Sequence, residues 1–208
     1  MKNGVLILDF GSQYTQLIAR RVRELNVFSK IEPFHIGVAK IKSLSPGAVI
    51  LSGGPASVYG GNSPTIDKAI LDTGIPVLGI CYGLHLIAYL SGMGVEPAGG
   101  REYGLANLEI TGQSELLHDV QNDSKVWMSH GDKITAYPAD FSVTARTSNT
   151  ENAVIESGSR KIYGVQFHPE VYHTVEGKKI IANFLFRIAR LTPDWNMGNF
   201  IKTTVAHV

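Results

Sequence analysis

Two segments of the chain combine residue types and spacing that suit nucleophilic catalysis. The first is Gly79-Ile80-Cys81-Tyr82-Gly83, which contains the only cysteine among 208 residues. It follows an apolar run and precedes an amphipathic one, so we expect a strand, a sharp turn and a helix. The second is Gly164-Val165-Gln166-Phe167-His168-Pro169-Glu170, at the end of another apolar run. Together the two segments predict a catalytic triad of Cys81, His168 and Glu170.

The predicted chemistry needs each of these residue types. A thiol attacks as the thiolate, and a helix N-terminus and a neighbouring histidine both favour that charged form. Small flanking residues are needed because such a turn is tight and must leave the sulfur open to substrate. Residues i and i+2 share a side of an extended chain, so Glu170 can orient His168 and stabilise its imidazolium.

An acyl-transfer reaction also needs hydrogen-bond donors for its oxyanion. The backbone N–H of Tyr82 is one candidate, and the Gly53-Gly54 pair can offer another because glycine permits close approach to a substrate. Each piece has a simpler interpretation. A lone cysteine in an apolar setting is usually an inert core residue, and the glycine and proline strings also mark turns. Their joint occurrence at predicted strand ends favours catalysis.

The first half of the chain has the pattern of a parallel sheet. Helical patterns alternate with apolar, strand-like runs at residues 5–9, 27–31, 48–51 and 77–80. We expect Ser12 to cap the first helix and a further helix over residues 64–71. Ligands bind beyond the carboxyl ends of parallel strands, where Asp9, the 52–55 segment and Cys81 fall.

The second half has a different pattern. Short strand-like runs separated by turn residues predict hairpins, at residues 106–110, 125–129, 142–145, 153–156 and 162–167. Residues 176–190 form a long amphipathic helix pattern. We therefore expect an α/β fold with a mixed, mostly parallel central sheet flanked by helices and a hairpin-rich second half.

Composition argues against several other classes of protein. The formal net charge is +1 with no long basic run, so nothing indicates nucleic-acid binding. One cysteine cannot form an internal disulfide, which favours a reducing compartment. No apolar run approaches the ~20 residues of a membrane helix, and the N-terminal apolar run is too short for a signal peptide. We expect a cytoplasmic protein. The histidines lack metal-ligand spacing, so no metal site is predicted.

The strings quoted above resemble those of the class I, triad-type glutamine amidotransferases. Within that family, the chain is most similar to the glutaminase domains of GMP synthetases, through residues 9–14 (DFGSQY), 51–58 (LSGGPASV), 128–132 (MSHGD) and 170–174 (EVYHT). The resemblance runs from about residue 5 to about residue 201, nearly the whole chain. It implies the flavodoxin-like arrangement of that family.

The resemblance also implies a role for each matching residue. Cys81 attacks the side-chain amide of glutamine, His168 passes a proton to the departing ammonia, and Glu170 orients His168. A glutamyl thioester forms and water releases glutamate, while the ammonia aminates xanthosine monophosphate to GMP at a synthetase site. The backbone amides of Gly54 and Tyr82 hold the oxyanion. The family positions near the bound glutamine match Gly53, Ser129, His130 and Gly131.

The chain departs from the family pattern in two respects. His85 stands where the family commonly has glutamine, and an imidazole has fewer donor and acceptor sites than an amide, so we expect an effect on glutamine binding. The Ser-Gly-Gly-x-Asp-Ser loop of an ATP-pyrophosphatase module is absent from the sequence. We expect an amidotransferase domain over residues 1–193 and, over residues 194–208, a tail or the start of a linker to that module.

The resemblance also implies partners and cofactors. The expected partner is an ATP-pyrophosphatase, either as a further domain or as a separate subunit. ATP and magnesium are expected only in that partner, and no cofactor is expected in this chain. Three alternatives stay open: the glutaminase subunit of anthranilate or aminodeoxychorismate synthase, a non-catalytic relative that binds glutamine, and a free-standing hydrolase of γ-glutamyl compounds.

Overall fold

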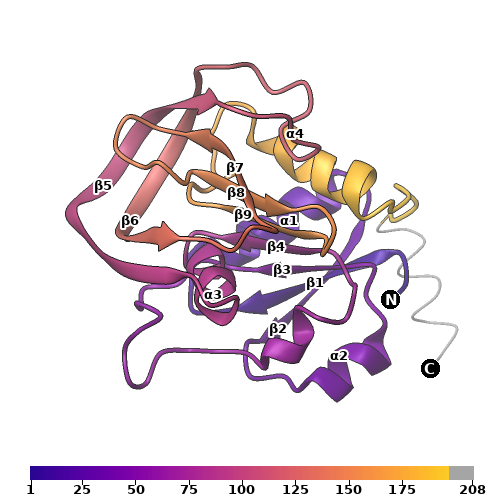
Figure 1. Cartoon of the computed structure of the whole chain (residues 1–208). Helices are drawn as coiled ribbons and strands as arrows, with labels where there is room; N and C mark the ends of the chain where they lie inside the picture. The colour runs from indigo at the N-terminus through magenta and orange to yellow at the C-terminus, as the bar shows by residue number, and fades with distance from the viewer. Residues whose placement is uncertain (197–208) are drawn as a thin grey trace, which may run out of the picture.

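The structure, a computed structural model, describes residues 1–196, and its first half alternates strands with helices (Figure 1). The strands are β1 (Gly4–Asp9), β2 (Phe28–Pro33), β3 (Ala48–Leu51) and β4 (Val77–Ile80). The helices are α1 (Thr15–Glu24), α2 (Val38–Leu44), the short 3₁₀ turn η1 (Lys68–Ile70) and α3 (Tyr82–Leu90). The predicted alternation in this half is confirmed.

The second half adds strands and one helical segment. The strands are β5 (Gly94–Ile110), β6 (Ser124–Ala136), β7 (Ser142–Arg146), β8 (Val154–Ser157) and β9 (Ile162–Val165). The helical segment is α4 (Gly177–Ala182), continued by the π-helical η2 (Asn183–Ile188). The predicted short strands at 106–110 and 125–129 are parts of β5 and β6, which form a long curved ribbon (Figure 1).

The strands follow the order β2-β1-β3-β4-β9-β8-β7-β5-β6. The predicted mixed sheet flanked by helices is confirmed, with one difference. The pairs from β2 to β9 are parallel, whereas those from β9 to β6 are antiparallel, so parallel pairing covers only half of the sheet. Short connections join β7, β8 and β9, and a short connection permits only antiparallel neighbours.

Both faces of the parallel half are buried, which explains its continuous apolar strands. In β1, Val5 and Ile7 join a core with α1 and α4, while Leu6 and Leu8 join the opposite core with α2 and α3. Figure 1 shows α1 and α4 on one side of the sheet and α2 and α3 on the other. The helices therefore fix the sheet from two sides.

Two predicted elements differ from the structure. Only η1 forms within residues 64–71. The Pro64 carbonyl accepts the Tyr82 hydroxyl instead of a helical amide, so no helix begins at Pro64. At the start of η1, the Asp67 side chain accepts the Ala69 N–H. Ser12 is not the cap of α1. Its hydroxyl accepts the Tyr14 N–H at 3.0 Å in a turn that precedes the helix.

None of the helices within residues 1–196 is long and apolar enough to cross a membrane.

The C-terminal end of the chain carries a further prediction. Of the predicted tail at 194–208, the structure describes three residues, and the Trp195 N–H donates to the Asn26 carbonyl at 2.8 Å. The remainder of the tail prediction lies outside the described residues.

The turn between β4 and α3 depends on two glycines. A Cβ atom on Gly79 would lie 2.5 Å from the backbone of Gly83, and one on Gly83 would lie 2.4 Å from the carbonyl oxygen of Leu51. Strand and helix backbones therefore approach more closely than any side chain would permit. This approach sets the backbone position of Cys81, the residue between them.

We predict that Gly79→Ala destabilises the fold, because its methyl group has no space against backbone atoms. Overpacking of this kind costs about 1 to 3 kcal/mol. The urea midpoint at equilibrium should fall accordingly. Gly61→Ala is the matched control, since nothing lies within 4 Å of a Cβ at Gly61. Equal midpoints for the two variants would contradict the proposed close approach.

Candidate active site

Four functional segments meet at the carboxyl edge of the parallel strands. Asp9 ends β1, Ser52 follows β3, Cys81 follows β4, and His168 comes three residues after β9. Parallel neighbours end at the same edge, so the sheet brings together residues that are far apart in sequence. This is the edge at which open α/β sheets bind ligands.

Cys81 occupies a strained turn at the start of α3. Its φ of 52° and ψ of −104° lie outside the regions that L-residues favour. The backbone is held there because the Cys81 N–H donates to the Val165 carbonyl at 2.8 Å, while the Cys81 carbonyl accepts the Leu84 and His85 amides at 3.0 and 3.2 Å. The sulfur therefore lies at the open N-terminal end of a helix.

His168 and Glu170 form a buried pair next to this cysteine. His168 Nδ1 lies 2.7 Å from Glu170 Oε1, and the Glu170 side chain is fully buried. Burial alone would lower the pKa of His168, but hydrogen bonds to Cys81 and Glu170 outweigh it and raise the pKa to about 10. The structure thus brings the three residues together, with the imidazole between the thiol and the carboxylate.

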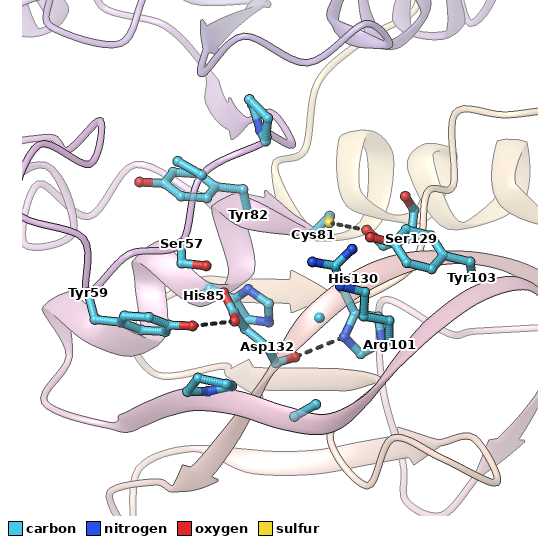
Figure 2. A pocket seen from close by; sticks show the side chains of 16 residues that line it. Ser57, Tyr59, Cys81, Tyr82, His85, Arg101, Tyr103, Ser129, His130 and Asp132 are labelled. Atoms are coloured by element: carbon cyan, nitrogen blue, oxygen red, sulfur yellow. Dashed lines mark hydrogen bonds between the residues drawn. The ribbon is translucent and has the colours of Figure 1, made fainter.

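A cavity of about 580 Å³ opens beside Cys81 (Figure 2). Seven of the residues that the sequence singled out line it: Gly54, Cys81, Tyr82, His85, Ser129, His130 and Gly131. A smaller cavity of about 290 Å³ also reaches Gly54, Cys81 and Ser129, and it has His168 in its wall. Cys81 therefore lies where the two cavities meet, in contact with the Ser129 carbonyl at 3.5 Å.

Gly53 and Gly54 have different positions. Gly53 lies behind His168, since a Cβ on Gly53 would be 3.1 Å from His168 Cε1. Gly54 lines both cavities, and a Cβ there would be 2.8 Å from the Phe10 carbonyl oxygen. A side chain at either position would therefore disturb the imidazole or the wall beside the thiol.

His85 is a neutral residue in the cavity wall. Burial lowers its pKa to about 4, and its Nε2 lies 2.6 Å from Gln166 Oε1. A neutral imidazole that donates through Nε2 keeps a lone pair on Nδ1. His85 is only 3% exposed, so the residue that replaces the family glutamine offers little surface to a ligand.

His130 belongs to a buried polar cluster that supports the opposite wall. Its Nδ1 lies 2.9 Å from the Asp132 carbonyl, and its Nε2 lies 3.2 Å from Glu102 and 3.1 Å from Thr150. Glu102 also accepts hydrogen bonds from Thr147 and Thr150. Both ring nitrogens of His130 are therefore engaged within the protein, and the cluster fixes β6 against β5.

Five polar or charged side chains of the cavity were given no role from the sequence: Ser57, Tyr59, Arg101, Tyr103 and Asp132. Asp132 is buried and accepts the Tyr59 hydroxyl at 2.7 Å, and Arg101 lies on β5 in the same wall (Figure 2). Asp132 is the last residue of the 128–132 string quoted above, which was a usable signal. Tyr59 directly follows the 51–58 string, whereas Arg101 comes from a strand without a motif, so only the fold brings Arg101 to the site.

The charges of the cavity are those expected for an amino-acid substrate. Arg101 can face a carboxylate and Asp132 can face an ammonium group, because opposite charges at close range favour each other strongly away from bulk water. Within residues 1–196, no group of three or more acidic, histidine or cysteine side chains is arranged to hold a metal ion. The cation of Arg101 and the carboxylate of Asp132 suit a zwitterion beside the thiol of Cys81.

The fold and the site define a class of protein: an α/β enzyme with a thiol placed for acyl transfer at a strand-to-helix turn. The family model described as "Glutamine amidotransferase class-I" matches residues 6–188. The chain belongs to the class I glutamine amidotransferase family.

Relatives and solved structures agree with this membership. The chain is 52% identical over 204 residues to a GMP synthase [glutamine-hydrolyzing] of Brachyspira hyodysenteriae, covering 98% of this chain and 40% of that protein. It is 48% identical over 207 residues to the enzyme of the same name from Syntrophomonas wolfei, covering 100% and 41%. The chain thus spans about 40% of the length of the curated relatives it matches.

Two solved structures have the same fold. A protein from Thermoplasma acidophilum, described as a putative GMP synthase subunit, superposes with a TM-score of 0.78 at 29% identity, over 90% of this chain and 94% of that chain. A glutamine amidotransferase from Thermotoga maritima superposes with a TM-score of 0.71 at 18% identity, over 91% of this chain and 99% of that chain. The latter likeness concerns the fold alone.

Replacement of Glu170 tests whether its carboxylate raises the pKa of His168. Glu170→Gln removes a carboxylate that favours the imidazolium, so the pKa of His168 should fall by about 1 to 2 pH units. The charged form, which persists to about pH 10 in the parent protein, should then be lost at lower pH. The C–H signals of the His168 ring, followed by NMR against pH, measure this directly.

Glu109→Gln is the control for that titration, since Glu109 is an exposed carboxylate paired with Arg146 on the antiparallel half. It should leave the His168 titration unchanged. An unaltered His168 titration in Glu170→Gln would mean that the carboxylate does not act on the imidazole.

Proposed function

We propose that this chain hydrolyses glutamine through Cys81 and supplies the ammonia for amination of xanthosine monophosphate, as the glutaminase part of a GMP synthase. The observation that carries the proposal is the linked arrangement of Cys81, His168 and Glu170 at the mouth of a cavity with opposite charges in its wall. The names of the relatives, which match this chain over nearly its whole length, support the choice of pathway.

The reaction begins with attack on the glutamine side chain. The Cys81 thiolate adds to the amide carbonyl carbon, and the carbonyl oxygen becomes an oxyanion. The backbone N–H groups of Gly54 and Tyr82 hold that oxyanion; the Tyr82 amide is in the first turn of α3 and has no acceptor within the helix. The imidazolium of His168 gives its proton to the amide nitrogen, so the C–N bond breaks and ammonia leaves.

The second half of the reaction releases glutamate. The γ-glutamyl group is now a thioester on Cys81, and neutral His168 takes a proton from a water molecule that attacks the same carbon. The C–S bond breaks, glutamate leaves, and the thiolate and imidazolium are restored. Glu170 stabilises the imidazolium in both halves, which its 2.7 Å contact with Nδ1 supports.

Recognition of glutamine uses the wall formed by β5 and β6. Asp132 pairs with the α-ammonium group and Arg101 with the α-carboxylate, while the backbone of Ser129, His130 and Gly131 lies along the substrate. Gly53 keeps the space behind His168 open. His85, held by Gln166, contributes shape to the cavity more than hydrogen bonds, which its low exposure supports.

The partner in this proposal is an ATP-pyrophosphatase, as a further domain or a separate subunit. ATP and magnesium act there, where xanthosine monophosphate is adenylated before ammonia attacks it. Residues 1–193 are the amidotransferase domain in this proposal, and residues 194–208 are a tail or the start of a linker to the partner. The proposed location is the cytoplasm, where the single cysteine stays reduced.

The proposed role in GMP synthesis is tested by asking whether glutamine hydrolysis depends on the partner and its nucleotide. The chain is mixed with an ATP-pyrophosphatase partner, xanthosine monophosphate, ATP and glutamine, and glutamate and GMP are both measured. Glutamate release should rise when nucleotide and partner are present together, since the two sites are energetically linked. Glutamate release that ignores both would refute the GMP synthase assignment while leaving a glutaminase.

We predict that Cys81→Ala lowers the rate of glutamine hydrolysis by a factor of about 10³ or more, because no other thiol is present in the sequence. Circular dichroism and the urea midpoint should stay close to those of the parent protein, since the substitution removes one sulfur atom. Glutamate release by the variant near the parental rate would mean that Cys81 is not the nucleophile.

We predict that Asp132→Asn weakens glutamine binding, raising KM about tenfold or more with a smaller effect on kcat, because it removes a charge that faces the α-ammonium group. Steady-state kinetics with glutamine give both constants. Asp140→Asn, an exposed carboxylate of the β6–β7 connection, serves as control. An unchanged KM for Asp132→Asn would exclude this pairing.

A further inference from the structure

A groove of about 460 Å³ lies beside the segment that carries His168 and Glu170. Three of the most exposed apolar side chains of the described residues line it: Tyr172, 87% exposed, Val175, 69%, and Leu105, 56%. Tyr103, two residues before Leu105 on β5, is also exposed and lines the substrate cavity. The apolar surface therefore extends from the rim of the active site to the groove. Clustered apolar exposure of this kind marks an interaction surface.

The charged residues of the groove all have one sign. Arg21, Lys125 and Lys178 line it, and no acidic side chain of the described residues does. Arg21 is paired with Glu24 at 2.8 Å, whereas Lys125 and Lys178 have no carboxylate within salt-bridge distance in residues 1–196. Two unpaired ammonium groups beside exposed apolar side chains fit a partner that presents carboxylates around an apolar centre.

The floor of the groove is bonded to the triad. Arg21 Nε donates to the Glu170 carbonyl at 3.0 Å, and the Thr174 hydroxyl donates to the His168 carbonyl at 2.6 Å. The Thr174 hydroxyl also accepts the Trp127 N–H at 3.1 Å. A molecule that fills the groove would therefore press on the backbone that carries the general base and its carboxylate.

We propose that this groove is the docking surface for the synthetase part of a GMP synthase, which binds it through an acidic segment with apolar side chains. The inference rests on the function proposed above. The chain spans about 40% of the length of the relatives it matches, so a GMP synthase of that size has a further part that this surface can receive. A second copy of the chain fits less well, because an isologous contact would bring the cations of two grooves together.

Docking at this place also couples the two activities. Ammonia has to pass to the synthetase without loss to solvent, and a partner seated on the apolar surface covers the rim at Tyr103. Contact with Tyr172 and Val175 acts through Thr174 and Arg21 on the positions of His168 and Glu170. The partner thereby aligns the triad when it is present.

The test uses a fusion in which this chain replaces the matching 204 residues of the Brachyspira hyodysenteriae GMP synthase. Lys125→Glu/Lys178→Glu and Tyr172→Asp are introduced into the fusion and into the chain alone. We expect each to lower GMP formation from glutamine about tenfold or more, while GMP formation from added ammonia and the glutaminase rate of the chain alone stay unchanged.

Two matched controls accompany these variants. Lys40→Glu/Lys42→Glu makes the same charge change on α2, and Tyr89→Asp removes an exposed aromatic ring at the end of α3. Both should keep glutamine-dependent GMP formation. Groove variants that behave like the controls would overturn the docking proposal.

The outcomes separate the two proposals. A fusion of the unaltered chain that makes GMP from ammonia but not from glutamine would reject the proposed function and the docking surface with it. A chain that sediments alone as a dimer, and as a monomer after Lys125→Glu/Lys178→Glu, would assign the groove to a second copy and overturn the synthetase as its occupant.

Discussion

The geometry of the site depends on the pairing of β4 with β9. The two strands lie in parallel register, Ile80 opposite Val165, and the ladder continues one residue further because the Cys81 N–H donates to the Val165 carbonyl. The backbone of Cys81 is thus held by the neighbouring strand, while that of His168, three residues beyond β9, is held by a bond from its N–H to the Trp127 carbonyl of β6 at 3.0 Å. The glycines on either side of Cys81 complete the constraint by letting α3 lie directly against the sheet.

The buried charges around His168 need neighbouring protein groups to replace the water that burial removes. A buried imidazolium costs desolvation energy, which a carboxylate on one side and a thiolate on the other offset. Glu170 contributes one oxygen to His168, while its second oxygen has no partner among the described residues. The carboxylate is therefore directed at the imidazole alone. On the opposite wall, Glu102, His130 and Thr150 form hydrogen bonds with one another. These bonds satisfy the buried polar side chains and hold β6 in place.

Much of this arrangement was predictable from the sequence because it is local or periodic. Continuous apolar runs identified the buried parallel strands, and glycine spacing identified the turn at Cys81. The parts that were not predictable depend on distant contacts. The proline-led helix at 64–71 is replaced by η1 since the Tyr82 hydroxyl binds the Pro64 carbonyl. The Tyr59–Asp132 bond and the pairing of His85 with Gln166 join segments that no pattern connects.

The position of β9 in the sheet also affects the order in which the molecule assembles. β9 is the strand at which the parallel and antiparallel halves join, and α3 and β5 to β8 separate it in sequence from its neighbour β4. Pairing across such a long stretch of chain has a high entropic cost and forms slowly. During folding, Cys81 therefore meets His168 only after the intervening strands are available. Until β9 has paired with β4, Cys81 lacks the His168 and Glu170 side chains that the folded molecule sets beside it.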